Sequence, residues 1–136
     1  MVLIDTSAWV EFLRRTGSPA HHSVARLLRR PKVANRVATT EPIVMELLAG
    51  PRAHRELIEV RRRLLNLRML HTGTLATWEL AAGIARACSA RGETIGSQMD
   101  CLIAAVAIRE GASILHADRD FDAIARHTAL RIEKVT

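Results

Sequence analysis

Acidic side chains stand where elements of the chain begin or end. Asp5 directly follows the apolar run at residues 2–4, and Asp118 and Asp120 follow a second apolar run at residues 113–115. Parallel strands place their carboxyl ends at one edge of a sheet, so we expect these acids to meet there. Asp100 lies in the first turn of a nearly all-apolar segment and is a candidate to join them.

Glu46 is the acid that an ordinary structural role explains least well. It lies in the middle of an apolar helical pattern and shares a helix face with Ile43. The pattern predicts a buried carboxylate, which is costly unless it is paired or binds a metal ion. An arginine partner is the alternative. Glu41, one turn earlier, sits at a helix start and needs no such explanation.

Each of the other acids has a structural alternative. Asp5 and either Asp118 or Asp120 are suited to cap the helices that follow them. Residues 97–100 (SQMD) have the pattern of a capping box, in which Asp100 bonds back to the helix start. Four carboxylates from separate elements at one sheet edge would repel one another. The set therefore predicts a hard divalent cation, Mg²⁺ or Mn²⁺.

A carboxylate-bound divalent cation predicts phosphodiester hydrolysis. Such a site activates water as a nucleophile and stabilises the charge that develops on a phosphate oxygen. We therefore expect in-line attack by water on a phosphodiester.

The charge distribution also favours an anionic partner. The formal net charge is +6, and residues 14–68 hold 13 Arg or Lys against four Glu. Eighteen of the 20 basic residues are Arg, which binds phosphate through a planar fork of donors. Nucleic acid is the leading candidate. The alternative is a genome that favours Arg codons for ordinary solvated faces.

Cysteine content and the chain start bear on the compartment. Cys88 and Cys101 lie inside apolar patterns without metal-ligand spacing, so we expect buried thiols in a reducing compartment. The first residues lack the features of a signal peptide, and no apolar run is long enough to span a membrane. We expect a cytoplasmic protein with no membrane association.

Strand and helix patterns alternate along the chain. The expected strands are at residues 2–4, 33–38, 67–70, 113–116 and 131–133. The expected helices are at about 6–15, from Ser18-Pro19 onward, and at 41–49, 53–66, 74–91, 99–109 and 119–126. This alternation predicts an α/β fold with a central parallel sheet of four or five strands flanked by helices, in one domain over residues 1–136.

Four segments resemble the PIN-domain family, and within it the VapC-type toxins of toxin–antitoxin pairs. They are residues 4–9 (IDTSAW), 41–50 (EPIVMELLAG), 97–104 (SQMDCLIA) and 116–121 (HADRDF). The resemblance spans nearly the whole chain, in order. It implies a three-layer α/β sandwich and a Mg²⁺- or Mn²⁺-dependent endoribonuclease. It also implies a VapB-type antitoxin partner and a homodimer.

The resemblance implies roles for individual residues as well. The metal-binding and catalytic carboxylates would be Asp5, Glu46, Asp100 and Asp118. Asp120 would support them or bind a second metal ion. Ser7 and Thr6 would lie beside the site and support it.

Three other interpretations account for part of the pattern. A magnesium-binding receiver-like phosphoryl switch also gathers acids at strand ends, but it needs a paired lysine, and neither Lys32 nor Lys134 follows a suitable strand. A non-catalytic basic RNA-binding module explains the arginines but not Glu46. A Ser-His-Asp hydrolase would use Ser7 and His116, yet the chain has no GxSxG motif.

Overall fold

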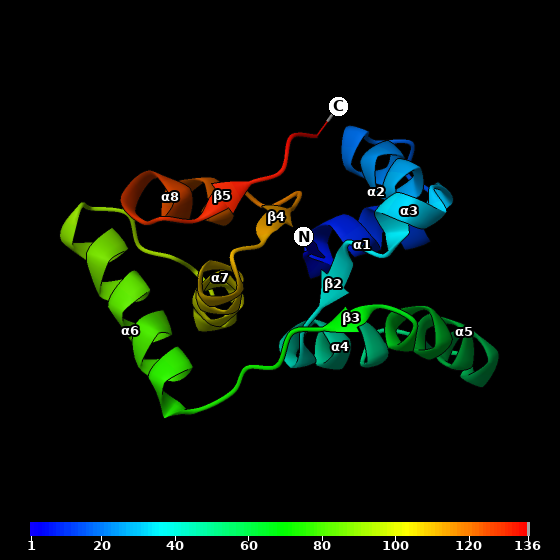
Figure 1. Ribbon diagram of the computed structural model, residues 1–136, viewed down its shortest axis with the longest axis horizontal. Helices are drawn as coiled ribbons and strands as arrows, with labels where there is room; N and C mark the ends of the chain where they lie inside the picture. The colour runs from blue at the N-terminus through cyan, green and yellow to red at the C-terminus, as the bar shows by residue number, and fades with distance from the viewer. Residues whose placement is uncertain (136) are drawn as a thin grey trace.

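Five short parallel strands form the centre of the protein (Figure 1). The computed structural model describes residues 1–135, apart from the side chains of Pro31 and Val33. The strands are β1 (Val2–Ile4), β2 (Val37–Thr39), β3 (Arg68–Met69), β4 (Ser113–Leu115) and β5 (Arg131–Ile132). They are ordered β3-β2-β1-β4-β5. Every neighbouring pair is parallel, so all carboxyl ends lie at one edge of the sheet.

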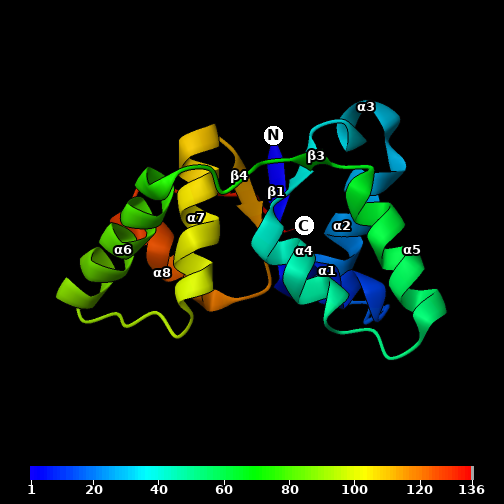
Figure 2. The same ribbon diagram turned by 90° about the horizontal axis from the view of Figure 1, so that it is seen from below.

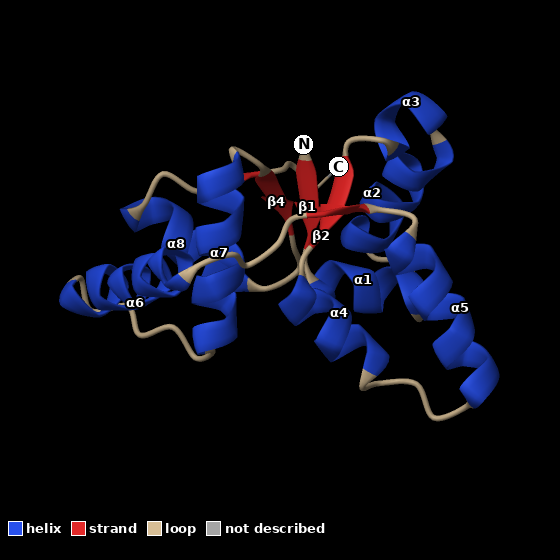
Figure 3. Ribbon diagram, turned by 60° about the horizontal axis from the view of Figure 1, so that its bottom comes forward, coloured by secondary structure: helices blue, strands red, loops and turns tan. Residues whose placement is uncertain are grey.

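Eight helices in the described residues surround this sheet. They are α1 (Thr6–Leu13), α2 (Pro19–Arg29), α3 (Pro31–Ala34), α4 (Glu41–Leu48), α5 (His54–Leu65), α6 (Leu75–Ala90), α7 (Gln98–Glu110) and α8 (Arg119–His127). Helices α6, α7 and α8 lie on one side of the strands, and α1, α2, α4 and α5 lie on the other (Figures 2 and 3). The predicted α/β sandwich with a central parallel sheet of four or five strands is confirmed, and the sheet has five.

The core is built around β1 and α7. Leu3 and Ile4 of β1 are fully buried, as expected for a central strand covered on both faces. Residues 101–107 of α7 are all buried, which explains why this helix is apolar on every side. Trp9 and Phe121 are the large aromatic side chains of an otherwise aliphatic core. Asp5 directly follows β1 and Asp100 lies in the first turn of α7, so the buried core positions both acids.

One expected strand is partly wrong. Residues 33–38 were expected to be extended, but α3 occupies the first two of them and β2 begins only at Val37. Pro31 is suited to the first position of a helical turn. The amide of Ala34 then donates to the carbonyl of Arg30 and closes that turn (2.6 Å). The other expected elements are present, with ends that differ by a few residues.

The connection from β3 to α6 is fixed from two sides. Arg109, near the end of α7, donates to the carbonyl of Thr72 (2.9 Å), the hydroxyl of Thr77 (2.6 Å) and the carbonyl of His71. Glu41, at the start of α4, accepts from the amide of Thr72 (2.8 Å) and pairs with the His71 ring (2.7 Å). The connection thereby joins the two helices that carry Glu46 and Asp100.

Gly73 gives a test of this connection. Its φ is +74°, and a Cβ there would lie 2.8 Å from Nη1 of Arg109. We expect Gly73→Ala to lower the free energy of unfolding by about 2–3 kcal/mol, because strained backbone and a clash add together. Gly17 is the matched control, since it has the same φ and open space around its Cβ. Gly17→Ala is expected to cost only about 1 kcal/mol in denaturant unfolding.

The Arg109→Ala background separates the two contributions. There, Gly73→Ala should cost no more than Gly17→Ala does in the wild-type protein, because the clashing guanidinium is absent. Equal costs of the two glycine substitutions in the wild-type protein would contradict the packing of Arg109 against Gly73.

Candidate metal centre

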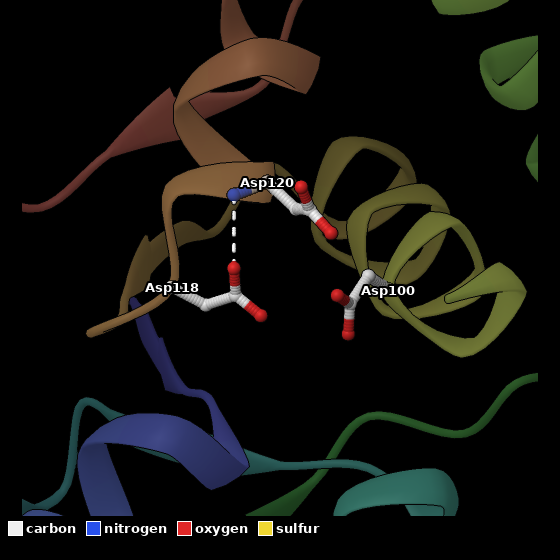
Figure 4. Close-up of side chains that lie close together, drawn as sticks. All are labelled: Asp100, Asp118 and Asp120. Carbon is white, nitrogen blue, oxygen red and sulfur yellow. Dashed lines mark hydrogen bonds between the residues drawn. The ribbon is translucent and has the colours of Figure 1, made fainter. Parts of the chain in front are cut away.

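Three aspartates converge at the carboxyl edge of the sheet. Asp100 comes from the first turn of α7, and Asp118 and Asp120 come from the start of α8. Each offers a carboxylate oxygen, and the three oxygens lie within 4.8 Å of one another. Figure 4 shows the three carboxylates pointing toward a common space. Asp100 therefore meets Asp118 and Asp120, although these acids are distant from it in the sequence.

Asp5 lies directly after β1 and is 3% exposed. Its Oδ2 accepts from the amide (2.9 Å) and the hydroxyl (2.6 Å) of Ser7, so it caps α1 as one alternative predicted. Its Oδ1 is buried and has no hydrogen-bond partner in the described part of the chain. Burial, followed by the charge of Asp118 as a weaker contribution, raises the pKa of this carboxyl despite the bonds from Ser7. One oxygen is thus held and the other is left for a ligand.

Ser7 joins the two sides of the site. Its Oγ donates to Asp5 and accepts from the amide of Ala117, 2.9 Å away, in the segment after β4. This side chain therefore fixes the end of β1 relative to the loop that carries Asp118. The predicted position of Ser7 beside the acids is what the structure shows.

Asp118 and Asp120 are held by backbone amides. Oδ1 of Asp118 accepts from the amide of Asp120 (2.9 Å), which makes Asp118 the cap of α8. Oδ2 of Asp120 accepts from the amide of Gly96 (3.3 Å), in the loop before α7. Here too the capping alternative and membership of the acidic cluster hold together, because a carboxylate has two oxygens.

Asp100 has a strongly raised pKa. Its pKa is raised from 3.8 to about 7, first by burial and then by the charges of Asp5, Asp118, Asp120 and Glu46. The expected capping box is wrong, because the Ser97 side chain makes no capping hydrogen bond. Asp100 instead faces the other aspartates (Figure 4).

The predicted burial of Glu46 is wrong. It was expected to be buried, but it is exposed, and α4 buries Ile43 and Leu47 instead. An eight-residue helix with a narrow buried face leaves Glu46 at the margin of the site. Its Oε1 accepts from the hydroxyl of Thr6 (3.2 Å). Its pKa is raised by partial burial and by the charge of Asp5, so its carboxylate lies near the other acids.

The five acids have no basic partner in residues 1–135. The ion pairs of the described residues do not include Asp5, Glu46, Asp100, Asp118 or Asp120. The arginine-partner alternative for Glu46 is thereby contradicted. The receiver-like interpretation needs a lysine paired with these acids. Lys32 and Lys134 are exposed, and neither forms an ion pair with them in the described residues. Clustered carboxylates with a free buried oxygen at Asp5 fit a divalent cation with oxygen ligands.

His116 rules out the Ser-His-Asp interpretation. Its Nε2 bonds to Asp122 (3.1 Å), and its Nδ1 accepts from the amide of Asp118 (3.0 Å). The Ser7 hydroxyl is occupied by Asp5 and Ala117. The two side chains are therefore engaged elsewhere, and they do not form a nucleophile–base pair.

Sequence reasoning missed three groups that hold the acids. These are the backbone amides of Gly96 and Ala117 and the ring of His116. A backbone donor leaves no trace in residue type, so the two amides carried no signal. Cys88 and Cys101 are free and buried, as expected. Over the described residues, the longest apolar helices fall short of what crossing a membrane requires.

Comparison with known proteins gives the family. The family model described as PIN domain matches residues 2–127. The ribonuclease VapC11 of Mycobacterium tuberculosis is 49% identical over 131 residues, which is 96% of this chain and 96% of that protein. The VapC ribonuclease Mb1587 of Mycobacterium bovis is similar to the same extent.

Solved structures agree at the level of the fold. A structure of VapBC2 from Rickettsia felis bound to promoter DNA has a TM-score of 0.74 at 19% identity, covering 98% of each chain. VapC20 of Mycobacterium tuberculosis, whose structure is described as that of a sarcin-ricin loop cleaving toxin, has a TM-score of 0.65 at 24% identity. It covers 96% of this chain and 99% of that one. With the family model matching most of its length and close relatives along the whole of it, the chain belongs to the PIN-domain family.

Proposed function

We propose that this chain is a VapC-type toxin, a metal-dependent endoribonuclease that hydrolyses RNA phosphodiester bonds. The observation that carries the proposal is the cluster of Asp100, Asp118 and Asp120 beside the buried free oxygen of Asp5. The relatives named ribonuclease VapC, at 49% identity over 96% of the chain, support the same activity.

The proposed ligands are the four acids Asp5, Glu46, Asp100 and Asp118, with Asp120 as support or as a ligand of a second ion. Mg²⁺ or Mn²⁺ is the proposed cofactor, because both ions prefer oxygen ligands and retain water molecules. When bound, the cation would supply Lewis-acid stabilisation of the phosphate charge and lower the pKa of water.

The residues of the chain would contribute position and proton transfer. Attack by water forms a bond from its oxygen to phosphorus, while the bond from phosphorus to the 3′ oxygen breaks. Glu46 is the exposed acid of the set, and its raised pKa suits it to accept the proton from water. The leaving 3′ oxygen takes a proton from solvent, so the products carry a 3′-hydroxyl and a 5′-phosphate.

A VapB-type antitoxin is the proposed protein partner. Similar solved structures include VapBC bound to DNA, such as that from Salmonella typhimurium. In this chain an open groove of about 880 Å³ lies between α1, α2 and α5. Its lining combines the apolar side chains of Phe12, Leu28 and Val60 with four arginines and two glutamates, so basic groups are in excess: Arg15, Arg29, Arg55 and Arg63 against Glu56 and Glu59. Such a groove favours an acidic segment with apolar side chains.

We also propose that the chain forms a homodimer and that it is cytoplasmic. Leu75 and Trp78 are exposed on one face of α6, which supports a homodimer that covers them. Two buried free cysteines are consistent with the proposed cytoplasmic location. The non-catalytic RNA-binding alternative predicts metal-independent RNA binding without cleavage.

Removing the charge of Asp100 should separate activity from stability. We expect Asp100→Asn to reduce RNA cleavage at least about a hundredfold, because a metal ligand is lost. The same variant should raise the melting temperature in EDTA, because it removes a charge that is unfavourable first through burial and then through repulsion by the other acids, the two causes that raise the pKa of Asp100. Cleavage of labelled single-stranded RNA and differential scanning fluorimetry give the two readings.

Glu79→Gln is the control for charge, since Glu79 is an exposed acid on α6 away from the cluster. It should change neither reading. Full RNA cleavage by the wild-type protein in excess EDTA would overturn the metal-dependent mechanism.

The pKa of Asp100 predicts a pH dependence with a definite sign. Its value in the folded chain, about 7, lies above the ordinary 3.8. Protonation therefore stabilises the metal-free fold, and this contribution is lost as the pH rises through about 7. The melting temperature in EDTA should fall between about pH 4 and 7 more steeply for the wild type than for Asp100→Asn.

Metal binding should respond in the opposite direction. Below pH 7 the cation displaces a proton from Asp100, so the Mn²⁺ affinity should rise about tenfold per pH unit. Isothermal titration at several pH values measures this slope. A slope that Asp100→Asn leaves unchanged would contradict a ligand role for this residue.

The basic groove can be tested by charge reversal. Arg29→Glu with Arg55→Glu should weaken antitoxin binding at least about tenfold, chiefly through slower association, because the rim would repel an acidic segment. Arg86→Glu with Arg91→Glu on and after α6 is the control of equal charge. Surface plasmon resonance with the purified antitoxin measures both. Equal affinities of the two double variants would place the antitoxin elsewhere.

A further inference from the structure

His116 is a buried histidine that the proposed mechanism does not use. It follows β4 directly and is 8% exposed. Its ring packs against the fully buried Phe121, with centroids 5.4 Å apart and planes tilted by 40°. The ring therefore has little freedom to move, and its two nitrogens have fixed directions.

The hydrogen bonds of the ring define its protonation. The backbone amide of Asp118 can only donate, so Nδ1 of His116, 3.0 Å away, must accept and carries no proton. The proton of the neutral ring is then on Nε2, which donates to Oδ1 of Asp122 at 3.1 Å. The His116 ring thus contacts the chain at Asp118 and again at Asp122.

These two bonds bracket the acids of the metal centre. The first fixes the backbone of Asp118, and the second fixes Asp122, two residues beyond Asp120 in the first turn of α8. Asp118 and Asp120 point toward Asp100 from this segment (Figure 4). A shift of the segment would move two carboxylates together.

We propose that His116 is a positioning residue of the metal centre, which orients Asp118 through Nδ1 and the first turn of α8 through Nε2. The inference rests on the proposed metal-binding function. It goes beyond that function because it assigns the geometry of the two aspartates to a side chain that touches neither the cation nor the RNA. Groups that orient metal ligands typically change metal affinity by about 10- to 100-fold when they are removed.

Two substitutions at His116 test the bond to Asp118. Leu fills most of the ring volume but has no acceptor, whereas the amide oxygen of Asn lies near the position of Nδ1. We expect His116→Leu to weaken Mn²⁺ binding about tenfold or more, and His116→Asn to remain within about threefold of the wild type. Isothermal titration with Mn²⁺ on the full chain is the measurement.

The order of the two variants separates positioning from packing. A role in packing alone predicts that the smaller Asn is the more damaging substitution. Mn²⁺ affinities that are equal, or lower for His116→Asn than for His116→Leu, would overturn the proposal.

Asp122 provides a second pair that does not depend on the folding of His116→Leu. Its side chain is 54% exposed, so both variants are expected to fold. Asp122→Asn and Asp122→Ala remove the same charge, but only Asn keeps an acceptor for Nε2. We expect Asp122→Ala to bind Mn²⁺ about threefold more weakly than Asp122→Asn. Equal affinities would show that the Nε2 contact positions nothing.

RNA cleavage is measured separately from Mn²⁺ binding. If the variants bind Mn²⁺ in the expected order but the wild-type chain does not cleave RNA, the nuclease proposal is refuted and the role of His116 stands. If the wild-type chain cleaves RNA but His116→Asn and His116→Leu bind Mn²⁺ equally well, the role of His116 is refuted and the nuclease proposal stands.

Discussion

Mutual repulsion of carboxylates is the constraint on which the rest of this structure depends. Asp100, Asp118 and Asp120 gather at one edge of the sheet, and the charges of Asp5 and Glu46 act on Asp100 as well. No basic side chain in the described residues pairs with these five acids. In a partly desolvated site such charges raise one another's pKa, as at Asp100. The remaining fold must hold them together without a cation, and apolar burial of β1 and α7 supplies the stability that this requires.

Three of the aspartates are held by a hydrogen bond to one carboxylate oxygen. Asp5 and Asp118 cap helices with one oxygen, and Asp120 accepts from the amide of Gly96. Ser7 bonds both Asp5 and the amide of Ala117. This side chain therefore connects the carboxyl ends of β1 and β4. Helix capping and ligand binding are alternative roles for a single acidic residue in a sequence. They are compatible, because a carboxylate has two oxygens and a helix N-terminus favours negative charge.

The sequence predicted the parts of the site that depend on element ends. Apolar runs before Asp5 and Asp118 located the carboxyl ends of two strands, and the all-apolar segment after Asp100 located a buried helix. It did not predict the exposure of Glu46, because a helical pattern gives the spacing of apolar residues but not how much of each face is covered. The helical turn at residues 31–34 was missed because Pro31 favours a turn that the β-branched residues nearby obscured. The ties from Gly96 and Ala117 depend on backbone atoms, which residue types do not reveal.

The distribution of charge over the molecule explains how an acid-rich centre can still attract a polyanion. The five carboxylates alone would repel RNA, and they carry a large share of the 14 acidic residues of the chain. The 20 basic residues outweigh them, and the exposed arginines of α2 and α5 lie on the other side of the sheet from α7 and α8 (Figure 2). The net charge of +6 favours approach of an anion at long range, while the cluster at the sheet edge is neutralised locally only by a cation. Attraction and chemistry are thereby assigned to different parts of the surface, and the second depends on a bound metal ion where the first does not.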